Sequence, residues 1–295
     1  MTRIVFAAVL SASILFVGPS ARAADDVPEA VFSHVADGKN LVFENPFNGK
    51  AWTIDLPQTW KFAIGGVEID LSPTRHTVIL WFSTALMILI LSLAARKRSL
   101  VPKGFYSLIE VLFNFVRVEL AEKNIGKEKS DEYVPFLATI FFLILVLNLM
   151  GAIPYSATAT ANLAVTGGLA LTTFFVTMYA GMKEQGAVGY WAGIVPQGVP
   201  GWLYPIMIPV EFLGMLTKPF ALMIRLFANM AAGHIVLFFL LALIFLLGSA
   251  GAFVAPVSVA FATGMFFLEL FVALLQAYIF ALLSALFIGM ASHPH

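Results

Sequence analysis

The sequence predicts an all-α polytopic membrane protein, on three observations. Of its 295 residues, 60% are hydrophobic and only 12% are charged, about half the roughly 25% that is typical of a soluble domain. Apolar runs long enough to cross a bilayer recur along the chain. Charged residues gather between these runs. We therefore expect a membrane domain over residues 73–292, with three roughly upright transmembrane helices, one amphipathic helix on the cytoplasmic surface, and a hairpin of two long, strongly tilted helices.

The first 23 residues have the layout of a secretory signal peptide. Arg3 precedes the apolar run Ile4–Val17, and small residues follow up to Ala23. Cleavage there leaves residues 24–72 as a polar extension on the outer, periplasmic side. A retained transmembrane helix and an organellar transit peptide are the alternatives. The run is short for a span, and transit peptides carry more arginine and serine.

Three single spans are expected next, and charge placement predicts their direction. Thr77–Ala95 has no charged residue, and the basic cluster Arg96–Arg98 follows it. The positive-inside rule keeps that cluster in the cytoplasm. Val134–Pro154 then returns outward and Asn162–Met182 crosses back, with Lys183 at its inner end. The mature N-terminus is thus predicted outside and the C-terminus inside a bacterial inner membrane.

Between the first two spans lies an amphipathic segment from Gly104 to about Asn124. Its apolar residues recur every three or four positions, while Glu110, Arg117 and Glu122 fall between them. This spacing is typical of a helix that lies on a membrane surface. We place it on the cytoplasmic face.

Two apolar segments, Tyr204–Leu247 and Ala252–Ala291, are too long to stand upright as straight spans. Each has about 40 residues, hence roughly 60 Å as a helix, twice the hydrocarbon thickness. Either each breaks into two spans or both tilt strongly. No cluster of polar turn residues interrupts either segment, so the tilted hairpin over residues 204–291 is favoured.

The hairpin carries five ionisable side chains of the Asp, Glu, Lys, Arg and His types in an apolar setting, which are Glu211, Lys218, Arg225, His234 and Glu269. An arginine at a helix centre costs at least about 2.5 to 3.5 kcal/mol by insertion scales, and it cannot neutralise itself by losing a proton. Arg225 therefore needs an acidic partner or water. The structural interpretation is an interhelical ion pair that only holds helices together, and the functional interpretation is a role in ion conduction.

Helical spacing puts Arg225 on a face of mostly small residues, namely Gly214, Lys218, Ala221, Ala228, Asn229 and Ala232. Such a face lets another helix approach closely, whether to slide past or to pack statically. His234 falls on the opposite face. In the second segment, Glu269 and Gln276 are seven residues apart and share a face.

The hairpin should bring Glu269 and Gln276 back past His234 and Arg225. A carboxyl group and an imidazole form a plausible proton relay. Glu211 and Lys218 lie nearer the cytoplasmic end. We interpret Glu211 as functional, whereas snorkelling to the interface explains Lys218.

Several classes of function are excluded by composition. The chain has no cysteine, so it offers neither disulfide nor thiol chemistry. It has no Walker-type glycine loop, so we expect no bound nucleotide. Its 17 basic and 17 acidic residues cancel, and nothing recruits nucleic acid. No cofactor or metal is expected.

Two stretches resemble the signature segments of a known family. Leu216–Ile235 reads LTKPFALMIRLFANMAAGHI and Leu274–Ser292 reads LLQAYIFALLSALFIGMAS. Together with NLMGAIP, they are similar to the a subunits of F-type, rotary ATP synthases, over about residues 76–292. The resemblance implies a non-catalytic stator subunit that works with a ring of c subunits and with peripheral-stalk b subunits.

The resemblance also implies roles for individual residues. Arg225 corresponds to the motif arginine that faces the c-ring carboxylates, between two offset aqueous half-channels, and Asn229 and Gln276 correspond to its polar neighbours. His234 and Glu269 are exchanged relative to one familiar bacterial pattern, as in the mitochondrial form. Some relatives have an acid where Gly151 stands, so no channel role is expected there.

Two rival functions remain open at this point, a secondary transporter and a structural membrane scaffold. The transporter predicts inverted halves with paired broken helices, and the sequence has no such repeat. The transported ion is expected to be H⁺ rather than Na⁺, since His234 suits a proton relay.

Overall fold

The computed structural model describes residues 38–44, 51–58, 61–64, 67–70, 72–96, 104–153, 158–193, 200–247 and 251–292. The expected signal peptide, residues 1–23, lies outside these described residues.

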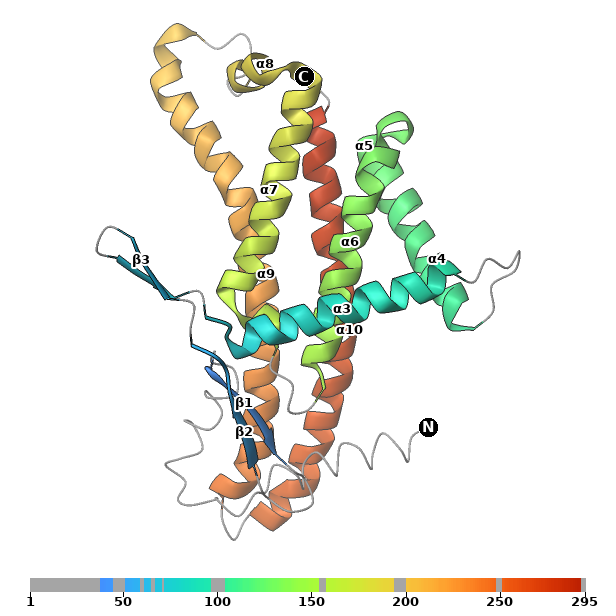
Figure 1. Cartoon of the computed structure of the whole chain (residues 1–295), viewed down its shortest axis with the longest axis vertical. Helices are drawn as coiled ribbons and strands as arrows, with labels where there is room; N and C mark the ends of the chain where they lie inside the picture. The colour runs from blue at the N-terminus through green and yellow to red at the C-terminus, as the bar shows by residue number, and fades with distance from the viewer. Residues whose placement is uncertain are drawn as a thin grey trace. The chain divides into compact units, whose positions relative to one another are not determined.

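Five described helices are long and apolar enough to cross a membrane (Figure 1). They are α3 (Arg75–Arg96), α6 (Lys127–Gly151), α7 (Leu163–Gln185), α9 (Tyr204–Leu246) and α10 (Gly251–Ser292). The all-α polytopic fold is thereby confirmed. The largest difference in bounds is at α6, which starts seven residues before the expected Val134. Its first turns are charged, so helix formation continues beyond the apolar run that predicted it.

The two long helices of the predicted hairpin are unbroken. α9 has 43 residues and contains Pro209 and Pro219, and α10 has 42 residues and contains Pro256. At 1.5 Å per residue each is roughly 60 Å long. Division of each segment into two spans is therefore wrong, while their tilt in a bilayer stays a prediction.

The extension ahead of α3 contains two short antiparallel hairpins, which the sequence did not predict. β1 (Asn40–Glu44) pairs with β2 (Ala51–Asp55), with Asn40 opposite Asp55. β3 (Lys61–Ile64) pairs with β4 (Val67–Asp70). The first hairpin is tied to the start of α3, because the backbone N–H of Arg75 donates to the carbonyl of Gly38 at 2.8 Å.

The amphipathic segment is helical, with an irregular turn. α4 (Phe105–Phe115) continues into a π-helical stretch, η1 (Val116–Glu122), and then into α5 (Lys123–Ile125). The i→i+5 bonds of a π-helix widen the turn. Val116, Leu120, Ala121 and Ile125 consequently all face inward and are buried, whereas no side chain of α4 is fully buried.

Shorter helices complete the chain. They are η2 (Ala159–Ala161) before α7, α8 (Ala187–Ala192) after it, and η3 (Gly201–Leu203) before α9.

The chain forms two compact units, each assembled from segments far apart in the sequence. The first consists of the residues up to Thr84, Leu147–Asn162 and Ala228–Ala273, and the second of Ala85–Val146, Leu163–Phe227 and the residues from Leu274. Each is described below by itself.

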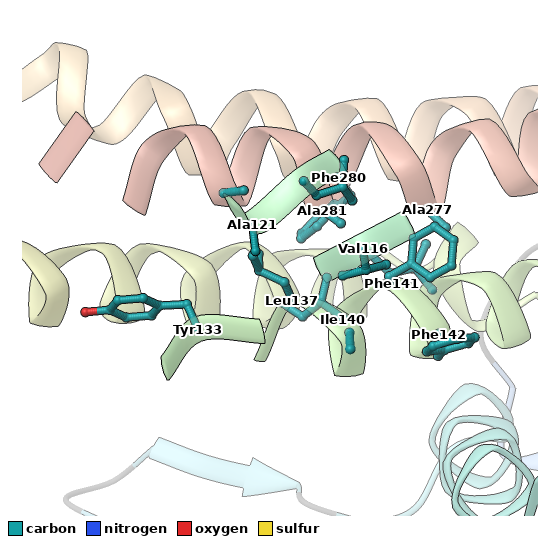
Figure 2. Close-up of a cluster of buried hydrophobic side chains, with 14 of the residues drawn as sticks. Val116, Ala121, Tyr133, Leu137, Ile140, Phe141, Phe142, Ala277, Phe280 and Ala281 are labelled. Atoms are coloured by element: carbon teal, nitrogen blue, oxygen red, sulfur yellow. The ribbon is translucent and has the colours of Figure 1, made fainter. Parts of the chain in front are cut away.

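The second unit contains the main hydrophobic core, in which η1, α6 and the C-terminal part of α10 meet (Figure 2). Large side chains such as Phe141 and Phe280 fill it, and both are about 1% exposed. The α10 side of the core is a row of fully buried alanines, Ala277, Ala281 and Ala285. Small residues four positions apart let helix backbones approach closely in a membrane.

Charged and polar contacts join three helix ends in the second unit. Lys183 of α7 pairs with Glu132 of α6 at 2.5 Å, and Lys129 pairs with Glu184 at 2.6 Å. Lys129 also reaches the carbonyl of Ser292, the last residue of α10, at 3.5 Å. The start of α6 and the ends of α7 and α10 therefore lie together, as the alternating spans require.

Candidate functional site

Arg225 lies on an exposed side of α9 in the second unit. Ala221, one turn before it, is exposed, as are Gly214 and Lys218 on the same face. Within the described part of the chain, the Arg225 guanidinium forms no ion pair. The small-residue face expected from the spacing is thus open along this part of α9.

The opposite side of α9 explains why Arg225 faces outward. Pro219, Leu222 and Leu226 are buried, and Leu222 and Leu226 belong to the hydrophobic core of the second unit. They follow at intervals of three and four residues, the spacing of one helix face. Packing of that apolar stripe therefore fixes the rotation of the helix and turns Arg225 away from the core. In the first unit, Ala228, Asn229 and Ala232 of α9 are exposed as well.

His234 and Glu269 meet inside the first unit. His234 Nδ1 lies 3.0 Å from Glu269 Oε1, and their side chains are 11% and 6% exposed. The pairing expected from the sequence is therefore present. The approach is not aligned as a hydrogen bond, because Oε1 has no hydrogen-bond partner among the described residues. A separation of 3.0 Å is nevertheless within reach of proton transfer.

The second nitrogen of His234 contacts a residue that the sequence did not single out. Thr158 Oγ1 forms a hydrogen bond with His234 Nε2. The same hydroxyl lies 3.5 Å from the backbone carbonyl of Gly151, to which it donates. His234 is thus held from both sides, by Glu269 at one ring nitrogen and by Thr158 at the other.

The segment that carries Thr158 is fixed by a second pair of polar side chains. Thr160 Oγ1 donates to Asn148 Oδ1 at 2.8 Å, and Asn148 Nδ2 lies 3.5 Å from the backbone carbonyl of Ala273 in α10. Asn148 and Thr160 are almost fully buried. Buried amides and hydroxyls are costly unless they are paired. The pair therefore ties the segment before α7 to the end of α6 and to α10.

The remaining predicted residues lie elsewhere. Gln276 is buried in the second unit, and Glu211 is exposed on the first third of α9. The Lys218 ammonium sits 5.5 Å from the centroid of the Phe287 ring of α10, a cation–π distance. Whether Lys218 has a structural role or a role in ion translocation stays a prediction.

The polar residues around His234 could have been noticed in the sequence. Asn148 interrupts an apolar span, and Thr158 and Thr160 alternate with alanine in the following segment. A polar residue inside a span is a reason to look for a partner. The spacing alone, however, does not say which helix that partner belongs to.

Comparison with known proteins gives consistent results. Residues 77–289 match the family model described as ATP synthase A chain. A protein of Myxococcus xanthus named ATP synthase subunit a is 57% identical over 233 residues, covering 77% of this chain and 76% of the relative. A protein of Anaeromyxobacter dehalogenans with the same name is 53% identical over 264 residues, which cover 87% of this chain and 67% of the relative. A protein of Chloroherpeton thalassium, also named ATP synthase subunit a, is 48% identical over 263 residues, which cover 88% of this chain and 75% of the relative.

Proposed function

Because the chain belongs to the ATP synthase A chain family, we propose that it is the ion-translocating stator subunit of a rotary ATP synthase. In this role it stands in the membrane beside a ring of c subunits and, with b subunits, forms the part that does not turn. It is not catalytic by itself, since ATP chemistry belongs to other subunits. The membrane is the bacterial inner membrane, with the mature N-terminus outside and the C-terminus in the cytoplasm.

The exposed arginine on α9 is the observation that carries this proposal. Arg225 is flanked by small exposed residues, with Ala221 and Ala228 on its two sides. A permanent cation that faced only hydrocarbon would cost at least about 2.5 to 3.5 kcal/mol. A passing carboxylate would offset that cost, and the small neighbours leave room for the helix that carries it. A c-ring, which presents one acid at a time, meets both requirements.

The charge on Arg225 couples proton transfer to rotation of the ring. A carboxylate beside it is stabilised as the anion, so it releases its proton into one half-channel. A carboxyl group that takes up a proton from the other half-channel becomes neutral and can leave the arginine for the lipid. The fixed cation also repels protons that would otherwise leak directly between the two channels. Asn229, Gln276 and Glu211 are the polar side chains that we assign to these routes.

The His234–Glu269 pair is proposed to lie on one of the half-channels. Two buried titratable groups 3.0 Å apart can exchange a proton without help from bulk water. This favours H⁺ as the coupling ion. ATP synthesis by membrane vesicles should therefore proceed equally well with and without sodium, and a requirement for sodium would contradict it.

Replacement of the arginine tests the function. Arg225→Ala should abolish ATP synthesis driven by a proton gradient in membrane vesicles, while the complex is still assembled and still hydrolyses ATP. Arg117→Ala is the matched control, since Arg117 is an exposed arginine of η1, and this variant should keep most of the synthesis. Retained synthesis in Arg225→Ala would contradict the proposal. Loss of the assembled complex would instead indicate a scaffold.

A further inference from the structure

The hydrogen bonds of the Thr158 hydroxyl influence which ring nitrogen of His234 carries the proton. A neutral imidazole has one N–H, either at Nδ1 or at Nε2, and the partner of each nitrogen decides which form is favoured. His234 has a different partner at each nitrogen, Glu269 at Nδ1 and Thr158 at Nε2. The tautomer therefore depends on whether the Thr158 hydroxyl donates to Nε2 or accepts from it.

A contact with the end of α6 indicates that the Thr158 hydroxyl accepts a hydrogen bond from His234 Nε2. Gly151 is the last residue of this helix, and the last carbonyls of a helix have no partner within it. The Thr158 hydroxyl has one proton and donates it to the Gly151 carbonyl. Its oxygen can then only accept from Nε2–H. Nδ1 is left without a proton, 3.0 Å from Glu269 Oε1.

Two further features hold Thr158 in place for this contact. A side chain at position 151 would collide with it, because a Cβ there would lie 2.6 Å from Thr158 Cγ2 and 2.8 Å from Oγ1. The absence of a side chain at Gly151 thus makes the room that Thr158 occupies. The neighbouring hydrogen bond between Thr160 and Asn148, at 2.8 Å, fixes the short segment that carries Thr158.

We propose that Thr158 is a positioning residue that holds neutral His234 with its proton on Nε2, so that Nδ1 is the only nitrogen that exchanges a proton with Glu269. The step moves one proton from the Glu269 carboxyl group to Nδ1, which leaves a carboxylate beside an imidazolium, and the reverse step restores both neutral groups. The Nε2 proton does not turn over. This inference rests on the proposed function for its purpose in the channel, but its geometry belongs to the first unit alone.

The tautomer can be read directly. The complex is labelled with ¹⁵N-histidine, reconstituted in lipid and measured by solid-state NMR, with the His234 signals isolated by subtracting the spectrum of His234→Gln. We expect a protonated Nε2 and an unprotonated Nδ1 in neutral His234. Thr158→Ser keeps the hydroxyl and should give the same spectrum, whereas Thr158→Val should give a mixture of both forms.

Proton pumping provides the second readout. Thr158→Val should slow ATP-driven pumping about tenfold, the effect of one lost buried hydrogen bond, and Thr158→Ser should restore more than half of the rate. Thr172→Val is the matched control, because it removes an exposed hydroxyl of α7 that donates to the carbonyl of Gly168 in the same helix. It should leave both the pumping rate and the His234 signals unchanged.

Three outcomes would overturn the inference. One is a proton on Nδ1 in the protein with Thr158 unchanged, a measurement that needs no Thr158 variant to assemble. Another is an unchanged spectrum in Thr158→Val, and the last is a Thr158→Ser variant that behaves like Thr158→Val. None of these affects the Arg225→Ala test, so failure of the tautomer assignment and failure of the stator function are distinguishable.

Discussion

Replacement of Gly289 by alanine should separate two packed elements of the second unit. Gly289 of α10 lies against the backbone at the end of α5. A Cβ at this position would overlap the carbonyl oxygen of Asn124, and it would lie 2.9 Å from the carbonyl carbon and 3.5 Å from the Ile125 Cα atom. These are backbone atoms, which cannot rotate away as a side chain does, so α10 or α5 has to move.

The magnitude follows from two opposing effects. Overpacking a well-filled site costs typically about 1 to 3 kcal/mol, and a clash with backbone belongs at the upper end. Replacing a helical glycine by alanine contributes about 0.5 to 1 kcal/mol in the other direction. The expected net loss is about 2 kcal/mol. Gly168→Ala is the matched control, because Gly168 of α7 is exposed and a Cβ there would meet nothing within 4 Å.

Heat-induced dissociation of the purified complex in detergent measures the difference. One kcal/mol shifts the midpoint by about 2 to 4 °C in a protein of 150 to 250 residues, so Gly289→Ala should lower it by roughly 4 to 8 °C. Gly168→Ala should leave it equal or slightly higher. If Gly289→Ala matched this control, the close approach of α10 to α5 would be refuted.

Two further predictions concern the second unit. Phe280→Ala should destabilise the chain by about 3 kcal/mol, the lower end of the range for Phe→Ala in a core. The lower end applies because lipid shields the ring in the unfolded state too. A loss of stability below about 1 kcal/mol in the same dissociation assay would contradict this prediction. Burial raises the pKa of the half-buried Tyr190 above its ordinary value of 10.0. Unfolded chains therefore ionise first, stability falls as the pH rises above about 10, and Tyr190→Phe should show a smaller alkaline loss of stability in a pH series of thermal midpoints.

The long helices were predictable from the sequence because bilayer thickness and hydrophobicity determine them directly. α9 and α10 end within a residue of the expected bounds, since apolar runs without polar turns leave no other place to stop. The pairing of His234 with Glu269 was also foreseen. Two ionisable side chains in facing apolar helices have few other partners, so burial forces them together.

The unpredicted features depend on contacts that spacing does not encode. The β1–β2 hairpin pairs two five-residue segments, NLVFE and AWTID, within an extension that was expected only to be polar. The π-helical turn of η1 comes with burial of the adjacent residues Leu120 and Ala121, which a spacing of three or four residues does not predict. Thr158 could not be connected with His234 because 76 residues separate them.

Both compact units depend on helices that are synthesised last, and this affects how the chain folds in the membrane. Both units need residues from α9 and α10, and the core of the second unit includes residues up to Ile288. While the chain leaves the ribosome, α3, α6 and α7 therefore enter the bilayer before their final neighbours exist, and lipid must shield their contact faces. Folding of this chain is consequently a late event that waits for its last helix, and a nascent chain that stops before Gly251 has neither complete unit.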